Sequence, residues 1–266
     1  MRGQALRQSL RQGHNVYGIA LEGYGQPLWP AHFARLGLDF VFIDGEHTPL
    51  DLETAAHAAQ AYAVRGIAPL FRIPEPSPVW AYRGLDLGAH GIIAPYVETV
   101  DQVRGLVGAV RYRPLKGAAL TAALDEGRFP SQDTQPYLEA FNADTLLVIM
   151  IESPAGVANL PQLLAVGGVD AVLMGPHDLS VSTGVPEQYD SPAFQSQVQT
   201  VVDTCLAHNV GVGIHCVLPD PDLALSWARL GCNLMVYASD TMFVLDGVEK
   251  GLGAVRRALA DETGSG

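Results

Sequence analysis

Five consecutive apolar runs of the sequence are each followed by a charged or titratable group. In chain order these groups are the Asp44-Gly45-Glu46-His47 segment, Arg72, Tyr96, Glu152 and Asp178. If the runs are the parallel strands of one barrel, their carboxyl ends meet at one rim. A charge at such a rim needs a partner charge or a metal ion. The pattern therefore predicts an active site at this rim.

Glu152 and Asp178 follow neighbouring apolar runs. Adjacent strands lie about 4.8 Å apart, so both carboxylates can reach one cation. Two carboxylates, with water and substrate in the remaining positions, describe an open octahedral site for Mg²⁺ or Mn²⁺. The alternative for Glu152 alone is that it caps the helix predicted to begin at Pro154 or pairs with an arginine.

His47 lies three residues after Asp44, so a hydrogen bond between the carboxylate and the imidazole is feasible. Such a bond fixes the imidazole tautomer and raises its basicity, as a general acid/base needs. The alternative is a loop histidine without a catalytic role. His177, beside Asp178, and His215, in the seventh apolar run, are further candidates to line the pocket.

Arg72 ends the third apolar run. Its planar guanidinium can bind a carboxylate or a developing enolate oxygen through two N–H groups. The alternative is a structural salt bridge to Asp44, Glu46 or Glu152.

The elements that would position these groups alternate between strands and helices. Eight continuous apolar runs, typical of strands buried on both faces, begin at Val16, Phe40, Ala68, Gly91, Thr145, Ala171, Gly211 and Leu234. Helices are predicted at 50–63, 77–87, 99–110, 154–165, 191–208, 219–230 and 240–259. Eight βα units in about 250 residues predict an α/β fold, a (β/α)₈ TIM barrel. An open doubly wound sheet is the rival, but no GxGxxG follows the first run.

No linker divides the chain, so residues 1–266 are predicted to form one barrel domain, with peripheral tails at about 1–13 and 260–266. The longest irregular region is expected at 111–133. It contains a basic cluster that would serve as an anion-facing flap or a subunit contact: Arg111, Tyr112, Arg113, Lys116 and Arg128.

Composition excludes several classes of protein. The 28 acidic residues against 16 Lys and Arg give a net charge of -12, which disfavours nucleic acids and anionic membrane surfaces. The N-terminus lacks the apolar segment of a signal peptide, and no apolar stretch is long enough to span a membrane. Three cysteines without CxxC spacing fit reduced thiols, so a cytoplasmic location is expected.

The chain also resembles a known family, the HpcH/HpaI aldolases, from about Val16 to Met242. The resemblance rests on several ordered motifs: GLDFVFIDGEHTPLDLE from Gly37, FRIPE from Phe71, GAHGIIAPYVET from Gly88, IESPAGVANL from Ile151, GPHDLS from Gly175 and the Asp-Thr-Met at Asp240. Members of this family are metal-dependent class II pyruvate aldolases. The resemblance implies a barrel that exchanges its last helix between subunits and assembles as a hexamer, a trimer of dimers.

Carried over by position, the resemblance makes Glu152 and Asp178 the metal ligands. It makes His47, supported by Asp44, the acid/base, and Arg72 the group that binds pyruvate and stabilises its enolate. The backbone amides of His177 and Asp178 would hold the pyruvate carboxylate. His215 stands where aliphatic residues often line the family's pocket.

These observations predict an aldolase that uses Mg²⁺ or Mn²⁺, with Co²⁺ or Zn²⁺ as further candidates. It would reversibly cleave hydroxy-keto diacids or keto-deoxy sugar acids to pyruvate and an aldehyde. A Schiff-base mechanism is disfavoured, because Lys116 falls in the irregular region and Lys250 in the last helix. The alternatives are oxaloacetate decarboxylation, lysis of a malyl- or citryl-CoA thioester, and a non-catalytic barrel that binds a keto acid.

Overall fold

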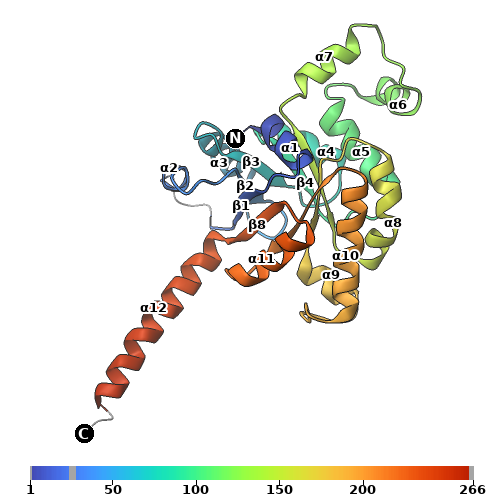
Figure 1. Ribbon diagram of the computed structural model, residues 1–266. Helices are drawn as coiled ribbons and strands as arrows, with labels where there is room; N and C mark the ends of the chain where they lie inside the picture. Colours follow the sequence, from blue (N-terminus) through green and yellow to red (C-terminus); the bar gives the residue numbers. More distant parts are fainter. Residues whose placement is uncertain (1, 24–27, 264–266) are drawn as a thin grey trace.

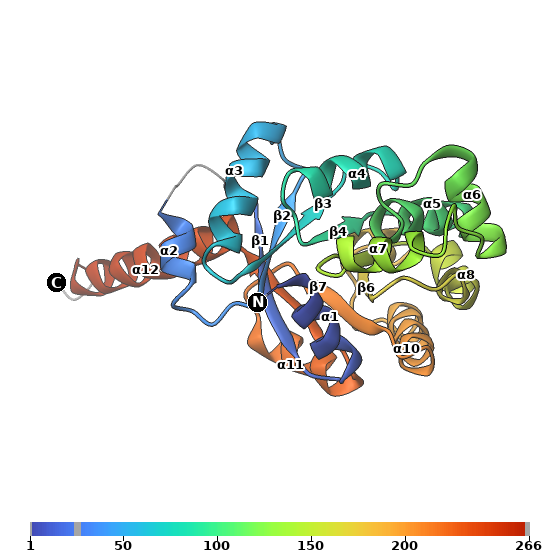
Figure 2. The same ribbon diagram turned by 90° about the horizontal axis from the view of Figure 1, so that it is seen from above.

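The computed structural model describes residues 2–23 and 28–263, with side chains up to residue 260. Its centre is a closed barrel of eight parallel strands, visible in Figures 1 and 2, in which each strand pairs with the next and β8 returns to β1. The strands are β1 (Val16–Leu21), β2 (Phe40–Asp44), β3 (Ala68–Arg72), β4 (Gly91–Ala94), β5 (Leu146–Ile151), β6 (Ala171–Met174), β7 (Gly211–Cys216) and β8 (Leu234–Ser239). All eight predicted strands are present, so the barrel is confirmed over the open sheet.

Helices surround the barrel. They are α1 (Gly3–Arg11), α2 (Trp29–Phe33), α3 (Leu52–Ala63), α4 (Pro78–Asp86), α5 (Val100–Arg111), α6 (Gly117–Glu126), α7 (Thr134–Phe141), α8 (Pro154–Ala165), α9 (Pro176–Ser182), α10 (Pro192–Ala207), α11 (Pro221–Leu230) and α12 (Asp240–Thr263). The seven predicted helices begin and end within a few residues of their expected bounds. Ser153 and Ser191 cap α8 and α10 by accepting the backbone N–H of Gly156 and Phe194, and proline fills the first position of each helix.

Alternate residues of the strands divide the core into two layers. Side chains such as Phe40, Phe42 and Leu70 fill the inside of the barrel. Their neighbours Val41, Ile43 and others pack outward against the helices. Because successive side chains of a strand point to opposite faces, continuous apolar runs are needed to supply both layers.

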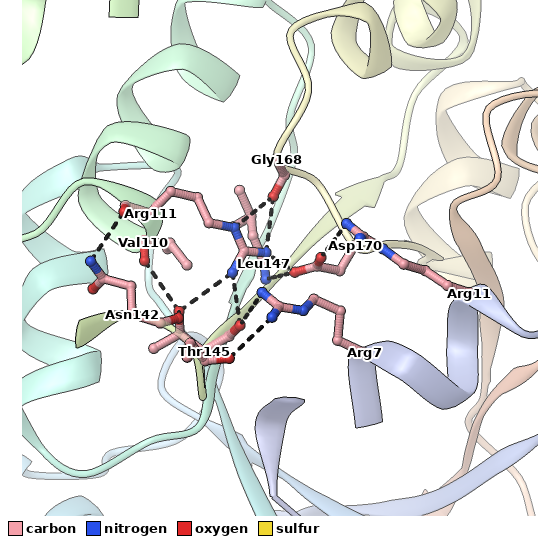
Figure 3. A network of polar contacts seen from close by, with 10 residues as sticks. Arg7, Arg11, Val110, Arg111, Asn142, Thr145, Leu147, Gly168 and Asp170 are labelled. Carbon is pink, nitrogen blue, oxygen red and sulfur yellow. Dashed lines mark hydrogen bonds and ion pairs between the residues drawn. The ribbon is translucent and has the colours of Figure 1, made fainter. Parts of the chain in front are cut away.

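A polar network closes the amino-terminal end of the barrel, drawn in Figure 3. The fully buried Asp170 carboxylate pairs with Arg11 and Arg111 and accepts the Leu147 N–H at 2.8 Å. Arg7 donates to backbone carbonyls at the start of β5, including that of Ala143 at 3.1 Å. The network therefore ties α1 and α5 to the first residues of β5 and β6.

Residues 1–13, expected to form a tail, contain α1. Leu6 and Leu10 lie one turn apart on this helix, and both are buried in the cluster inside the barrel. The amino-terminal segment thus covers the bottom of the barrel and belongs to its core.

The expectation of an irregular region at 111–133 is wrong in part, because residues 117–126 form α6. The basic residues there are engaged by the protein: Arg113 pairs with Asp86 at 3.0 Å and Arg128 with Glu126 at 2.8 Å. Asn142, just after α7, donates to the carbonyls of Arg111 and Arg113. The segment lies at the amino-terminal end of the barrel, away from the rim where the candidate site residues gather.

The last helix, α12, runs away from the barrel as a single rod (Figure 1). Several of its apolar side chains are exposed in the single chain: Phe243, Val244, Leu245, Val248, Leu252, Val255 and Leu259. Of the predicted tail 260–266, residues 264–266 lie outside the described part of the chain. Within that part, no helix is both long enough and apolar enough to cross a membrane.

Candidate active site

A buried ion pair joins the ends of β2 and β3 at the carboxyl end of the barrel, here called the mouth. Asp44 and Arg72 are register partners, and Arg72 donates to both Asp44 oxygens, at 2.8 and 2.7 Å. Burial alone raises the pKa of Asp44, but the hydrogen bonds and charge of Arg72 outweigh it and the pKa is lowered. Asp44 is therefore a stable anion that fixes the Arg72 guanidinium in one orientation.

The His47 imidazole lies beside Glu46. Its Nε2 is 3.7 Å from Glu46 Oε2, and the same oxygen lies 3.1 Å from Arg72 Nη1. The Asp44 carboxylate accepts the backbone N–H of His47 at 3.4 Å and is held by Arg72. The sequence analysis expected the Asp44 carboxylate beside the His47 imidazole, whereas in the structure the Glu46 carboxylate lies there. Asp44 and His47 are brought together at the mouth through the loop backbone.

Glu152 follows β5 and is 5% exposed. Its Oε2 accepts the backbone N–H of Tyr96 at 2.7 Å. The pKa of Glu152 is raised to about 7: burial is the largest cause, and the carboxylates of Asp178 and Glu46 add to it, against the lowering effects of the Tyr96 N–H and the Arg72 charge. A Cβ on Gly175 would overlap the Glu152 carboxylate, so glycine leaves the space that this side chain occupies. The alternative that Glu152 caps α8 does not hold, since Ser153 caps that helix.

Asp178 and His177 lie in the first turn of α9, directly after β6. Asp178 is half-buried, and its charge acts on both Glu152 and Glu46. His177 is more exposed, and its Nδ1 lies 3.4 Å from Glu187. The structure therefore brings Asp178 together with Glu152, whereas the His177 side chain points toward Glu187.

His215 points into the barrel from β7. Its ring lies 5.8 Å from that of Phe42, over which the Arg72 guanidinium is also placed, at 4.9 Å. Burial, with a further contribution from Arg72, lowers the pKa of His215 to about 4. The imidazole is therefore neutral near pH 7 and forms part of the interior beneath Arg72.

The donor set at the mouth fits a hard divalent cation. The charge of Asp178 raises the pKa of both Glu152 and Glu46, and a cation beside these carboxylates would oppose that effect. Among the residues that the structure describes, no three His, Cys, Asp or Glu side chains group closely enough to hold a metal by themselves. A pair of carboxylates that leaves positions for water and substrate agrees with that finding.

Sequence reasoning missed two contributions to the site. Glu46 was named as a partner for Arg72 but not as a neighbour of His47, although both lie in the DGEH segment. The N–H bond from Tyr96 to Glu152 depends on a backbone conformation that no sequence motif indicates.

The raised pKa of Glu152 predicts a pH-dependent stability of the metal-free protein. The folded state retains a proton that the unfolded chain releases from a carboxyl of pKa 4.5. This stabilisation is complete below that value and is lost as the pH rises through about 7. Urea unfolding of EDTA-treated protein should show wild type losing up to roughly 3 kcal/mol relative to Glu152→Gln between about pH 4.5 and 7. Parallel pH curves for the two proteins would contradict it.

Comparisons with known proteins agree with this site and fold. Residues 25–246 match the HpcH/HpaI aldolase/citrate lyase family model. The 2-keto-3-deoxy-L-rhamnonate aldolase of Escherichia coli O157:H7 is 33% identical over 252 residues, covering 92% of this chain and 91% of its own.

Solved structures give the same result. An HpcH/HpaI aldolase/citrate lyase family protein from Burkholderia cenocepacia J2315 superposes with a TM-score of 0.80 at 27% identity, over 95% of this chain and 99% of its own. Citrate synthase SbnG superposes with a TM-score of 0.79 at 28% identity, over 95% and 98%. The predicted family and enzyme class are confirmed: the chain belongs to the HpcH/HpaI aldolase/citrate lyase family.

Proposed function

We propose that this protein is a divalent-metal-dependent aldolase that cleaves 4-hydroxy-2-keto acids to pyruvate and an aldehyde, and catalyses the reverse condensation. One observation carries the proposal: the fixed Arg72 guanidinium and the carboxylates of Glu152 and Asp178 meet at one end of the barrel. The similarity to relatives named as 2-keto-3-deoxy-L-rhamnonate aldolases supports the same reaction class.

Glu152 and Asp178 would hold the cation, with Mg²⁺ or Mn²⁺ best suited to oxygen ligands and Co²⁺ or Zn²⁺ as further candidates. When bound, the metal would supply Lewis-acid polarisation of the substrate's keto group. The N–H of Tyr96 keeps the Glu152 side chain in place, and Gly175 leaves the space for it.

Arg72 supplies positive charge where the keto oxygen becomes negative during cleavage. Its side chain is 8% exposed and is already oriented by Asp44, so little reorganisation is needed during the reaction. The resemblance also assigns the substrate carboxylate to the backbone N–H groups of His177 and Asp178. These lie in the first turn of α9, where N–H groups have no partner within the helix.

His47 would take the proton from the C4 hydroxyl in cleavage and return it in condensation. Its side chain is 65% exposed at the mouth, where the outer part of a substrate would lie. The Glu46 carboxylate lies next to Nε2, so it can orient the imidazole. His215, neutral and internal, would line the pocket beneath Arg72.

The described structure disfavours a CoA thioester as the substrate. The basic residues between Arg111 and Arg128 were the candidates to bind its phosphates. They lie at the opposite end of the barrel and are paired with acidic side chains or backbone carbonyls, as Arg111, Arg113 and Arg128 show. Decarboxylation of oxaloacetate needs only the keto-acid end of the same site and is compatible with it.

We also propose that the protein is a homo-oligomer that exchanges α12 between subunits, as a hexamer. An apolar groove of about 470 Å³ lies outside β1 and β8, lined by Ile19, Trp29, Phe33 and others. In a closed (β/α)₈ barrel a helix following β8 would cover this face, yet only the start of α12, with Phe243 and Val244, lines the groove, and the rest of the helix extends away from the barrel (Figure 1). The exposed apolar side chains of α12 match a groove of this character.

The central test of the function is release of pyruvate from a 2-keto-3-deoxy sugar acid, coupled to lactate dehydrogenase. EDTA-stripped enzyme should be inactive, and added Mg²⁺ or Mn²⁺ should restore turnover. Absence of pyruvate with every metal, with oxaloacetate tried in parallel, would refute the aldolase proposal.

The role of His47 predicts that His47→Ala lowers kcat by roughly 10²- to 10⁴-fold, the usual contribution of a general acid/base. His57→Ala, an exposed histidine on α3, is the matched control and should leave kcat unchanged. Near-wild-type turnover of His47→Ala would remove the imidazole from the mechanism.

The oligomer proposal predicts that Leu245→Lys with Leu252→Lys dissociates the assembly, because the charges would enter an apolar interface. Both side chains are exposed in the single chain, so the fold itself should survive. Sedimentation velocity measures the outcome, with Glu249→Gln as the control. A monomeric wild type, or an unchanged assembly in the double variant, would argue against exchange of α12.

A further inference from the structure

Tyr96 adopts a backbone conformation that is unfavourable for its residue type. It follows β4 by two residues and has a φ of 49°, in the left-handed region. Glycine enters this region freely, whereas a tyrosine does so only at an energetic cost. Strain of this kind persists where the surrounding structure imposes it, and it occurs often at functional sites.

The backbone N–H of Tyr96 has a clear role at the site, but any residue with an N–H could fill that role. Its N–H donates to Glu152 Oε2 at 2.7 Å and so positions a predicted metal ligand. A glycine at this position would supply the same N–H without strain. The side chain must therefore contribute something else.

The phenol ring reaches across the mouth toward α9. Its Oη lies 3.5 Å from the hydroxyl of Ser182, one turn after Asp178 on that helix. Tyr96 is 45% exposed, so a large part of the residue remains accessible to a ligand at the mouth. Tyr96 is thus tied to one predicted metal ligand through its backbone and lies near the helix of the other through its hydroxyl.

The depth of the other groups indicates which part of a substrate would meet this ring. Arg72 and Glu152 are 8% and 5% exposed, so the keto-acid end would bind below the rim. The remainder of the substrate must then extend outward past the residues at the mouth. Tyr96 and Ser182 offer two uncharged hydroxyls and one apolar ring face, which suit a polyhydroxylated chain. Neither residue carries the positive charge that would pair with a second carboxylate.

We propose that Tyr96 is a specificity-determining residue that binds the hydroxylated chain of a keto-deoxy sugar acid, beyond its keto-acid end. The assignment rests on the aldolase function proposed above. It makes the enzyme selective for sugar acids over hydroxy-keto diacids.

Two reactions of the same holoenzyme test this assignment. Cleavage of a six-carbon 2-keto-3-deoxy sugar acid uses the mouth, whereas decarboxylation of oxaloacetate uses only the keto-acid end. Tyr96→Phe should raise KM for the sugar acid about 3- to 10-fold, the effect of one neutral hydrogen bond. Tyr96→Ala should lower kcat/KM for it at least about tenfold, mainly through KM. Oxaloacetate decarboxylation should stay within about twofold in both variants.

Two further variants separate substrate binding from folding. Tyr96→Gly keeps the N–H and relieves the strain, so it should remain at least as stable as wild type and show the same loss as Tyr96→Ala. Tyr137→Ala removes an exposed tyrosine of α7, near the other end of the barrel, and should change neither reaction.

Two results would overturn the assignment. If kcat/KM for the sugar acid is unchanged in Tyr96→Ala, the side chain does not bind substrate. If both reactions fall by the same factor, Tyr96 acts on the shared keto-acid end. If the proposed aldolase function itself is wrong, wild type will release no pyruvate from the sugar acid with any metal. That result differs from the two above and would also overturn the assignment of Tyr96.

Discussion

The buried pair of Asp44 and Arg72 is the interaction on which the candidate site depends. A guanidinium below the rim of a barrel is costly unless a carboxylate compensates it with direct hydrogen bonds. Register pairing of β2 with β3 places the two residues opposite one another, so the sheet itself supplies the partner. The pair then fixes the point of positive charge around which Glu46, Glu152 and His215 are arranged.

The two ends of the barrel use the same residue types for different purposes. At the amino-terminal end, Asp170 and Arg111 are bonded to each other and to the backbone, as Figure 3 shows, and the network holds α1 in place. At the mouth, Asp44 and Arg72 are also bonded to each other, but the Arg72 guanidinium faces the carboxylates of Glu46 and Glu152 as well. The first network joins structural elements, whereas the second gathers charged groups at the end of the barrel where (β/α)₈ enzymes bind their substrates.

Much of this architecture could be predicted from sequence, because strands buried on both faces require continuous apolar runs. The same reasoning fails where position depends on tertiary contacts. Helix α6 has weak sequence signals, and α1 resembles a tail until Leu6 and Leu10 meet the interior of the barrel. The pattern of apolar residues in α12 likewise predicts a helix but does not predict the direction in which the helix leaves the barrel.

The candidate residues Asp44, Arg72, Glu152 and Asp178 could be found from sequence, because each lies at or just after the end of a predicted strand. Parallel strands of a barrel bring their carboxyl ends together. Which carboxylate faces the His47 imidazole was not predictable, because Asp44 and Glu46 are both within reach in the chain and Arg72 binds Asp44 bidentately. The left-handed backbone of Tyr96 is visible only in three dimensions.

The central claim is that Glu152 and Asp178 form an open cation site beside Arg72. Titration of Mn²⁺ followed by electron paramagnetic resonance tests it directly, with wild type, Glu152→Gln and Asp178→Asn compared in the presence of pyruvate. The account predicts one bound ion per chain in wild type and at least a tenfold weaker affinity in each variant. Unchanged Mn²⁺ affinity in either variant would contradict it.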